Sequence, residues 1–291
     1  MRIIFLFIFS IAILFNAKAQ LAADKIVLKN NQPFALVAGG SKGIGYAIAE
    51  ALAKRKYNLV LIARGVPALQ EAQQKLQSTY GIQVEIISQD LSKDDAAEKL
   101  RHWCEQNQLP LKMLCNVAGL GGDKDMGELS TDSLRYMIRL NLENPVALTN
   151  ELLPLLEKNR PAYILNVASM AGLTPSPPKN IYAATKSGVL YFGYGLKYDL
   201  KKHNKGITVS TLAPGPVYTK PQIVKTTRKQ LGKFGDWMAV PPARVGEVAV
   251  KRTLKGRTLI IPGGWSHLIS VGLRALPSRW AAAIYSKLEK E

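Results

Sequence analysis

The sequence predicts a single α/β domain, built as a doubly wound, seven-stranded parallel sheet with helices on both faces. Seven short apolar runs alternate with six longer segments of helical periodicity. Strict alternation of strands and helices favours a parallel sheet with right-handed crossovers. At 291 residues the chain is long enough to bury such a core, and no internal repeat or linker divides it.

The strands and helices can be placed in order along the chain. Strands are expected at 34–38, 58–63, 83–88, 113–116, 162–167, 208–213 and 258–262. Helices are expected at 46–54, 67–80, 94–105, 131–157, 181–203 and 245–255. The basic stretch that leads to residue 242 shows no clear period, and we expect it to be irregular. The α/β domain therefore spans residues 33–262, and residues 263–291 form a C-terminal helical extension.

The first twenty residues differ from the rest of the chain. Arg2 precedes a largely apolar run at 3–15, and Ala17 and Ala19 flank Lys18 to give a small-x-small site. This layout is typical of a secretory signal peptide, and the run is shorter than the ~20 residues that a transmembrane helix needs. An uncleaved, shallow membrane anchor is the alternative.

Charge is distributed unevenly. Of the formal net charge of +18, residues 201–291 carry +13, from 17 Lys or Arg and 4 acidic residues. This part is expected to face an anion, namely a phosphorylated cofactor or substrate, acidic lipid or nucleic acid, unless it is simply a solvated basic face. The two cysteines, Cys104 and Cys115, have no metal-ligand spacing, so the sequence indicates neither a zinc site nor a disulfide framework.

A glycine-rich turn connects the first strand to the first helix. Gly39, Gly43 and Gly45 lie in it, together with Ser41 and Lys42. Glycine lets the backbone turn tightly and approach a pyrophosphate, which then lies at the helix N-terminus, where N–H groups point outward. The order of strand, glycine turn and helix predicts a dinucleotide-binding unit of the Rossmann type. An ATPase phosphate loop is excluded, because no Gly-Lys-Ser/Thr follows at the required spacing.

The end of the second strand indicates which dinucleotide is bound. An NAD site is expected to place an acid here for the ribose 2′-hydroxyl, whereas a 2′-phosphate needs a cation. No acidic residue occurs between Glu50 and Glu71, and Arg64 follows the strand directly. Lys42, in the glycine turn, adds a second positive charge. The predicted cofactor is therefore NADP(H).

Tyr182 and Lys186 lie four residues apart in a predicted helix, so that the phenol and the ammonium share one face. A cation beside a phenol favours the phenolate, which makes the phenol a usable proton donor or acceptor near neutral pH. The spacing alone is short and common, and by itself it favours an ordinary helix face.

The positions of other residues change that balance. Residues suited to ligand binding directly follow predicted strands: the glycine turn, Arg64, Asp90, Asn116, Ser169 and Pro214. Because parallel strands end at one edge of the sheet, these residues are expected to converge there with Tyr182 and Lys186. Asn141 lies within the predicted helix 131–157, either on an exposed face or, because Pro145 follows it, at a kink that frees backbone carbonyls.

Several motifs in this order resemble those of the short-chain dehydrogenase/reductase family over residues 33–262. Residues 38–45, Ala-Gly-Gly-Ser-Lys-Gly-Ile-Gly, are similar to the family's Thr-Gly-x-x-x-Gly-x-Gly, and residues 115–119, Cys-Asn-Val-Ala-Gly, to its Asn-Asn-Ala-Gly. Pro214-Gly215 with Thr219 resembles the segment that closes on the nicotinamide carboxamide. The residues that match the family's catalytic tetrad are Asn141, Ser169, Tyr182 and Lys186.

The resemblance implies hydride transfer between a nicotinamide and a carbonyl carbon, with Tyr182 as the general acid. Lys186 would favour the phenolate of Tyr182 and bind the nicotinamide ribose. Ser169 would hydrogen-bond the developing alkoxide, and Asn141 would hold a water for proton relay. The implied cofactor-binding residues are Gly39, Ser41, Lys42, Gly43, Ile44, Gly45, Arg64, Asp90, Leu91, Asn116, Ala118, Gly119, Tyr182, Lys186, Pro214, Gly215, Val217 and Thr219.

Three classes of function are considered. The complete tetrad favours an NADPH-dependent oxidoreductase that interconverts a carbonyl and an alcohol on a small molecule, expected to be a lipophilic ketone or a 3-oxoacyl-type substrate. A catalytically silent NADP-binding regulator on the same fold is the alternative. Nucleic-acid binding is disfavoured, because Trp237, Trp265 and Trp280 are not interleaved with the charges as a stacking platform requires. A homo-oligomer is also expected.

The location of the protein follows from two opposing observations. Residues 1–20 look exportable, yet NADPH is regenerated inside cells. An anchor that leaves the domain in the cytoplasm reconciles them. Three lysines, Lys18, Lys25 and Lys29, follow the apolar run, whereas only Arg2 precedes it, and the more basic flank of a membrane segment stays in the cytoplasm. The basic C-terminal part, with apolar residues beside arginines at 268–280, favours an anionic membrane surface as a further partner. Export after cleavage near Ala19 is the alternative.

Overall fold

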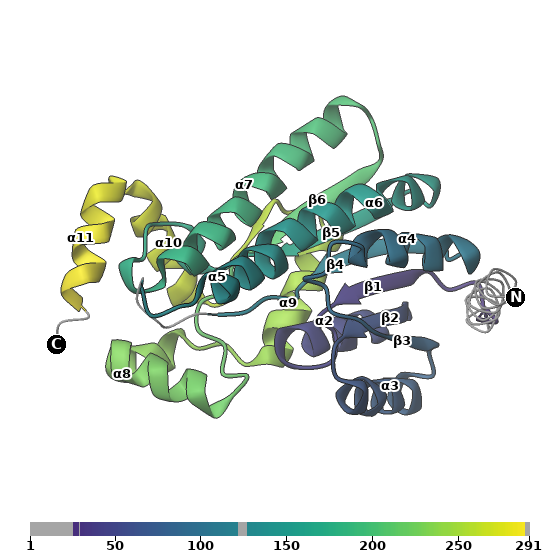
Figure 1. The fold of residues 1–291 in the computed structure, drawn as a ribbon, viewed down its shortest axis with the longest axis horizontal. Helices are drawn as coiled ribbons and strands as arrows, with labels where there is room; N and C mark the ends of the chain where they lie inside the picture. The colour runs from purple at the N-terminus through teal and green to yellow at the C-terminus, as the bar shows by residue number, and fades with distance from the viewer. Residues whose placement is uncertain (1–25, 29, 122–126, 289–291) are drawn as a thin grey trace, which may run out of the picture.

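The computed structural model describes residues 26–28, 30–121 and 127–288. Its centre is a seven-stranded sheet in the order β3-β2-β1-β4-β5-β6-β7, in which neighbouring strands are parallel (Figure 1). The predicted fold class is thereby confirmed. The strands are β1 (Phe34–Ala38), β2 (Asn58–Ala63), β3 (Val84–Ser88), β4 (Leu111–Asn116), β5 (Ala162–Val167), β6 (Ile207–Leu212) and β7 (Leu259–Ile260).

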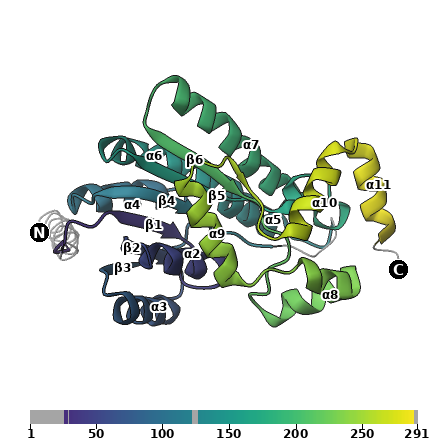
Figure 2. The same ribbon diagram turned by 180° about the vertical axis from the view of Figure 1, so that it is seen from behind.

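Helices cover both faces of the sheet (Figures 1 and 2). One face packs against α2 (Gly43–Ala53), α3 (Val66–Tyr80) and α9 (Pro242–Leu254). The other packs against α4 (Ala96–Gln106), α6 (Asn144–Lys158) and α7 (Asn180–Lys202). Three further helices, α8 (Pro221–Met238), α10 (Gly264–Ala275) and α11 (Ser278–Leu288), gather at the end of the molecule toward which the strands point.

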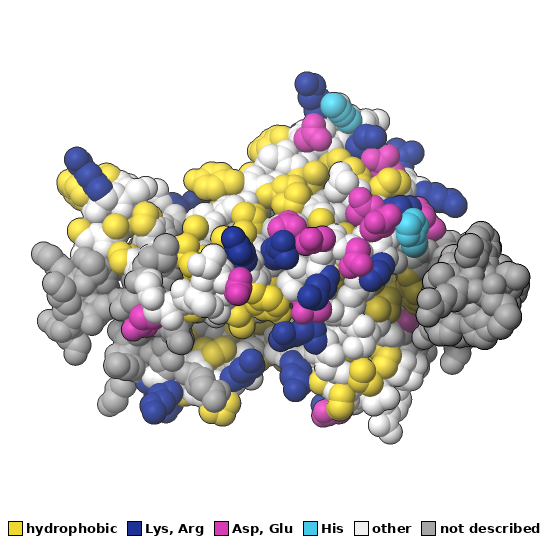
Figure 3. Space-filling model, in the orientation of Figure 1, with side chains coloured by type: hydrophobic (Ala, Val, Ile, Leu, Met, Phe, Trp, Pro, Cys, Tyr) yellow, Lys and Arg dark blue, Asp and Glu magenta, His cyan; other side chains and the backbone are white. Residues whose placement is uncertain are grey.

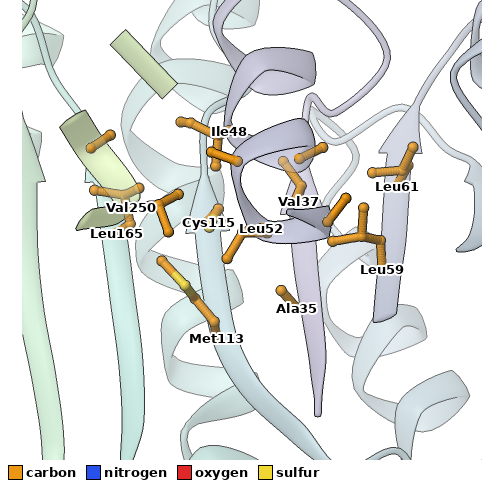
Figure 4. Packing of buried hydrophobic residues seen from close by; sticks show 14 of the residues in the cluster. Ala35, Val37, Ile48, Leu52, Leu59, Leu61, Met113, Cys115, Leu165 and Val250 are labelled. Atoms are coloured by element: carbon orange, nitrogen blue, oxygen red, sulfur yellow. The ribbon is translucent and has the colours of Figure 1, made fainter. Parts of the chain in front are cut away.

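The central strands are largely apolar because both of their faces are covered. All five residues of β1 are fully buried. Ala35 and Val37 pack with Ile48 and Leu52 of α2 (Figure 4), whereas Phe34 and Leu36 point to the opposite layer. A strand buried on both faces has no polar alternation, which is why the strands are recognisable as short apolar runs.

The strand order reverses between β1 and β4. From β1 the sheet grows through β2 and β3 in one direction, and from β4 through β5, β6 and β7 in the other. The chain therefore leaves these two neighbouring strands toward opposite faces, which opens a crevice beyond their carboxyl ends. The backbone N–H groups of Val117 and Ala118 both donate to the Ala38 carbonyl, at 3.0 and 2.7 Å, and fix the two exits together.

The single helix expected at 131–157 is interrupted. The structure has α5 (Thr131–Ile138), a π-helical turn (Arg139–Glu143) and then α6. Pro145 lacks the N–H that would bond the Asn141 carbonyl in an α-helix, and the Asn144 N–H reaches back to the Arg139 carbonyl. The turn places Asn141 inside the protein at 1% exposure, so the interpretation of Asn141 as a residue on an exposed face is wrong.

The prediction of irregular structure before residue 242 is also wrong. A helix, α8, occupies most of this stretch, with Pro221 in its first turn and a break at Gly232, whose φ is 55°. Thr227 and Met238 are among its buried side chains. The sequence signal is weak because lysines, threonines and two glycines interrupt the apolar period that would mark a helix.

The predicted signal peptide or anchor at residues 1–20 lies outside the described residues and stays a prediction. In the described ranges, no helix combines the length and the apolar character that crossing a bilayer requires. The first described residue, Ile26, is held by its N–H to the Asn107 side chain at 2.7 Å, near the start of β4.

The contact between α2 and α9 should depend on Gly246. A Cβ atom there would lie 2.2 Å from the Ala47 carbonyl oxygen of α2, a contact that only backbone movement relieves. Gly246→Ala is expected to lower the free energy of unfolding by about 1–3 kcal/mol. Gly272→Ala is the matched control, since that α10 glycine is exposed with nothing near its Cβ position, and alanine there should be neutral or stabilising. Thermal or denaturant unfolding of both variants tests this, and equal stability of the two contradicts the packing account.

Candidate functional site

Loops that follow several strands meet at the carboxyl edge of the sheet. The turn after β5 and the Pro214 loop after β6 are joined by the Met170 N–H, which donates to the Pro214 carbonyl at 3.0 Å. The Val240 N–H donates to the Pro216 carbonyl at 3.1 Å and ties the same loop to the chain before α9. These backbone bonds fix the edge on which the functional side chains stand.

Lys186 is the most perturbed charged group of this edge. Its side chain is 4% exposed, and its ammonium donates to the Val167 carbonyl, at the end of β5, at 2.8 Å. The ammonium nitrogen lies 5.9 Å from the centre of the Tyr182 ring. Burial away from water lowers the pKa of Lys186 from 10.5 to about 8. The spacing of four residues therefore brings the two side chains together, as the sequence predicts.

Asn141 reaches the same place from the π-helical turn. Its side-chain oxygen accepts from the Leu120 N–H at 2.7 Å, and its amide donates to the Leu120 carbonyl at 2.9 Å and to the Thr185 hydroxyl at 3.2 Å. A Cβ atom on Gly119 would lie 3.1 Å from the Lys186 ammonium and 3.2 Å from the Asn141 oxygen. Asn141 thus holds the backbone after β4 beside Lys186, and its side chain is occupied in doing so.

Ser169 begins a short 3-10 turn (Met170–Gly172) just beyond β5. Its hydroxyl oxygen accepts from the Ala171 N–H at 3.2 Å, which orients the hydroxyl. The turn presses on α7, since a Cβ on Gly172 would lie 2.6 Å from the Lys186 backbone, and the Ser187 hydroxyl donates to the Gly172 carbonyl at 2.6 Å. Ser169 is therefore positioned against the helix that carries Tyr182 and Lys186.

The glycine turn after β1 has the backbone that the sequence predicts. Gly39 and Gly43 have φ values of 88° and 57°, which L-residues rarely adopt. A Cβ on Gly45 would lie 1.9 Å from the Gly39 carbonyl oxygen, so the turn cannot close with a larger residue. Ser41, Lys42 and Ile44 complete this turn, and Lys42 is exposed at the N-terminus of α2. Beside it, Thr219 of the Pro214 loop comes within 3.2 Å of the Cβ position of Gly43.

Arg64 belongs to a polar cluster at the end of β2. Its guanidinium carbon lies 5.7 Å from the ring centre of Tyr136, which α5 contributes. Asp90, after β3, accepts from the N–H and the hydroxyl of Ser92 at 3.0 and 2.8 Å. Although partial burial opposes its ionisation, the bonds from Ser92 and the charge of Arg64 hold the pKa of Asp90 below its usual value.

The remaining residues predicted to bind the cofactor differ in their burial and in the direction of their side chains. The Asn116 amide points into the protein, where it donates to Asn166 at 2.9 Å and to Thr149 at 3.1 Å. Leu91 and Val217 are buried at 4% and 6% exposure. Ala118 and Gly119 line the exit from β4, and Pro214 and Gly215 the exit from β6. The side chain of Asn116 therefore joins β4, β5 and α6.

An open hollow of about 660 Å³ adjoins this edge. It lies alongside Thr219 at the start of α8. Arg228 is paired with Asp236 at 3.1 Å, and Asp236 accepts from the Tyr218 hydroxyl at 2.6 Å, which fastens the hollow's wall. The hollow's lining does not include the Tyr182 group. It is lined by Tyr218, Thr219, Lys220, Pro221, Val224, Lys225 and Arg228.

Sequence reasoning missed three contributors to the site. Tyr136 lies beside Arg64, Thr185 accepts from Asn141, and Thr149 accepts from Asn116. Thr185 directly precedes Lys186 in the sequence, so its position near the site could have been predicted. Thr149 reaches Asn116 from α6 to β4, and Tyr136 reaches Arg64 from α5 to the segment after β2; no local pattern reveals either contact.

Comparison with known proteins agrees with this geometry. The family model described as short chain dehydrogenase matches residues 33–230. The very-long-chain 3-oxoacyl-CoA reductase of Mus musculus is 31% identical over 254 residues, which cover 85% of this chain and 76% of that protein. Two solved structures share the fold. One, concerning 7beta-hydroxysteroid dehydrogenase stereoselectivity, has a TM-score of 0.78 at 20% identity and covers 87% of this chain and 96% of that one.

The other is a short-chain dehydrogenase from Sphingobium yanoikuyae in complex with NADPH. It has a TM-score of 0.70 at 23% identity and covers 82% of this chain and 93% of that one. The family model extends from β1 into α8 and so includes the glycine turn, the tetrad and the Pro214 loop. Together with the parallel sheet and its reversal point, this match shows that the chain belongs to the short-chain dehydrogenase family, whose members are oxidoreductases that act on CH–OH groups.

Proposed function

We propose that this protein is an NADP(H)-dependent oxidoreductase that interconverts a carbonyl and an alcohol on a lipophilic ketone or a 3-oxoacyl-type substrate. One observation carries the proposal: the buried Lys186 ammonium lies 5.9 Å from the Tyr182 ring at the carboxyl edge of the sheet. An ammonium is costly to bury, and a desolvated charge in a crevice beside a phenol is typical of a catalytic site.

The residues present fit a dinucleotide cofactor. The left-handed backbone at Gly39 and Gly43 gives close access to the N-terminus of α2, where a pyrophosphate would be held. Lys42 and Arg64 would hold a 2′-phosphate, and Gly119 leaves open the space in front of Lys186 that a Cβ would fill. When bound, the nicotinamide supplies or accepts the hydride. The NADPH present in the Sphingobium yanoikuyae structure supports this choice of cofactor.

Each tetrad residue has a role that its contacts suit. The Tyr182 hydroxyl would donate the proton to the substrate oxygen during reduction. With a pKa of about 8, Lys186 is still mainly protonated at neutral pH and supplies the cation that favours the phenolate. Ser169 uses its oxygen to accept from Ala171, so its own proton can be donated to the developing alkoxide. The side chain of Asn141 positions Leu120, and its backbone carbonyl, which Pro145 cannot bond, would hold the relay water.

The proposed substrate class follows from the surroundings of Ser169 and from the hollow beside Thr219. Next to Ser169, Met170 packs in an apolar cluster with Met238 and Ile261, a setting suited to a hydrocarbon chain. The hollow carries Lys220 and Lys225, in addition to Arg228, whose charge is paired with Asp236, and this positive lining suits a substrate on an anionic carrier. The name of the mouse relative, a 3-oxoacyl-CoA reductase, supports the same class.

The proposed assembly and location rest on separate features. Exposed apolar residues on α6 and α7, including Val146 and Tyr191, support a homo-oligomer. We keep the proposal that residues 1–20 anchor a cytoplasmic domain, with export after cleavage near Ala19 as the alternative. N-terminal sequencing of the fractionated protein separates these, because a soluble mature chain that begins at Gln20 excludes the anchor.

Replacing Tyr182 by Phe tests the catalytic proposal. The ring and its packing stay, and only the proton donor is lost, so turnover of a carbonyl substrate should fall by about 10²–10⁴-fold. NADPH affinity, measured by fluorescence titration, should be nearly unchanged. Tyr191→Phe is the matched control, because Tyr191 lies on the same helix at 72% exposure and should keep full activity. Full activity of Tyr182→Phe would exclude the assigned mechanism.

The pKa of Lys186 predicts a pH-dependent stability. The folded, cofactor-free protein loses this proton near pH 8, whereas the unfolded chain keeps it to pH 10.5, so stability should rise with pH across this window. The full effect is about 3 kcal/mol. Lys186→Met removes the titrating group, so the free energy of unfolding of the wild type relative to this variant should increase from pH 8 to pH 10. Denaturant unfolding at several pH values measures it, and a constant difference contradicts the burial of a charged Lys186.

Arg64 tests the choice of cofactor. Arg64→Asp replaces a cation that would pair with the 2′-phosphate by an anion that repels it, so NADPH should bind about 10- to 100-fold more weakly. NADH affinity should change little. Arg252→Asp, an exposed cation on α9, is the control and should affect neither cofactor. A wild-type protein that already prefers NADH would show the assignment to be wrong.

A further inference from the structure

We propose that the outer face of α10, with the start of α11, docks on a lipid bilayer that carries anionic headgroups. The inference rests on the exposure and charge of these helices and does not depend on the cofactor or substrate proposed above. We call this surface the lipid face. It consists of Trp265, Leu268, Val271 and Trp280, flanked by Arg274 and Arg279.

α10 has exposed apolar residues on its outer side, in addition to apolar and small polar residues on its inner side. Its inner side buries Ser266 and Ser270, at 0% and 1% exposure. Its outer side exposes Trp265, Leu268 and Val271, at 52%, 63% and 56%. A soluble surface helix normally presents polar residues on its outer side, so a contiguous apolar stripe of this kind marks a contact site.

Charge identifies the partner as anionic lipid. Residues 264–288 include Arg274, Arg279 and Lys287 and contain no Asp or Glu. Tryptophan rings favour the boundary between hydrocarbon and headgroups, and arginines at that depth pair with anionic headgroups. A second copy of the same surface is a poorer occupant, because a two-fold contact would bring the face's own arginines together without an acid between them.

The position of α10 connects the lipid face to the site. The inner residues Ile269 and Leu273 pack on the apolar cluster that contains Met170, the neighbour of Ser169. Ser266 lies against the Pro214 loop, with its hydroxyl 2.6 Å from the Cβ position of Gly215. In Figure 3, which shows one side of the molecule, some apolar side chains are visible at this end between polar and backbone atoms. Docking would therefore place a lipid surface one helix away from the candidate site.

Tryptophan quenching by brominated lipids in the full chain tests the lipid face. An anchor at residues 1–20 would hold the chain on any vesicle, so the measurement must report on these helices and not on total binding. The chain has four tryptophans, and Trp103 packs in the α4 layer away from this end. With vesicles of brominated phosphatidylcholine and phosphatidylglycerol, the wild type and Trp103→Phe should be quenched alike. The double variant Trp265→Phe/Trp280→Phe should lose the larger part of the quenching.

A charge placed on the lipid face gives the second arm. Leu268→Glu should reduce the quenching of Trp265 severalfold and leave turnover of a water-soluble ketone unchanged. Tyr198→Glu is the matched control, since it puts the same charge at a residue of 65% exposure on α7 and should leave the quenching intact. Equal quenching on pure phosphatidylcholine overturns the requirement for anionic lipid. Absence of Trp265 quenching on vesicle-bound protein, or a dimer that shields Trp265 in solution, overturns the lipid face itself.

Discussion

The burial of the Lys186 ammonium is the constraint on which the site depends. A cation removed from water needs a partner, and here the Val167 carbonyl at the end of β5 provides it at 2.8 Å. That bond fixes α7 against the end of β5, and the 3-10 turn that begins at Ser169 is pressed on the Lys186 backbone at Gly172. Tyr182, one turn away on the same helix, inherits its position from these contacts. The contacts that pack this edge of the sheet are therefore the same contacts that position the proposed catalytic residues.

The topology of the sheet and the backbone of its loops form this edge of the molecule. The reversal of strand order between β1 and β4 sends the neighbouring loops to opposite faces, and the shared bonds to the Ala38 carbonyl keep their exits together. The glycine turn adjoins that crevice, and at the β4 exit Gly119 lacks the side chain that would press on the Lys186 ammonium. The Pro214 loop, tied to the Ser169 turn, closes the same space from the other side. Sites of this kind need little more than loop variation to change substrate.

Some elements of the fold and of the site could be predicted from the sequence, and others could not. Most strands were recognisable because burial on both faces makes them largely apolar, and the glycine turn because its backbone excludes side chains. The helix α8 was missed because Gly232 breaks its period and because lysines and threonines interrupt its apolar residues. The cluster of Arg64 with Tyr136 was missed for another reason: the two residues are 72 positions apart, one after β2 and one on α5, and they meet only in the folded chain. A short sequence motif therefore identifies the residues of one loop, whereas the residues that contact them from elsewhere in the chain depend on the fold.

The π-helical turn at Arg139–Glu143 has a consequence for how this chain can vary in length. Such a turn is equivalent to one residue inserted into an α-helix, at some expense in hydrogen-bond geometry. Deleting one residue there would restore a regular α-helix with α5 and α6 in nearly their present orientation, because the wide turn accommodates the additional residue within a single turn. The residues of the turn itself would be redistributed around the helix axis, so Asn141 would lose the bulge that directs it toward Leu120 and Thr185. The segment 131–158 should therefore tolerate substitutions on its outer surface far more readily than any change of length.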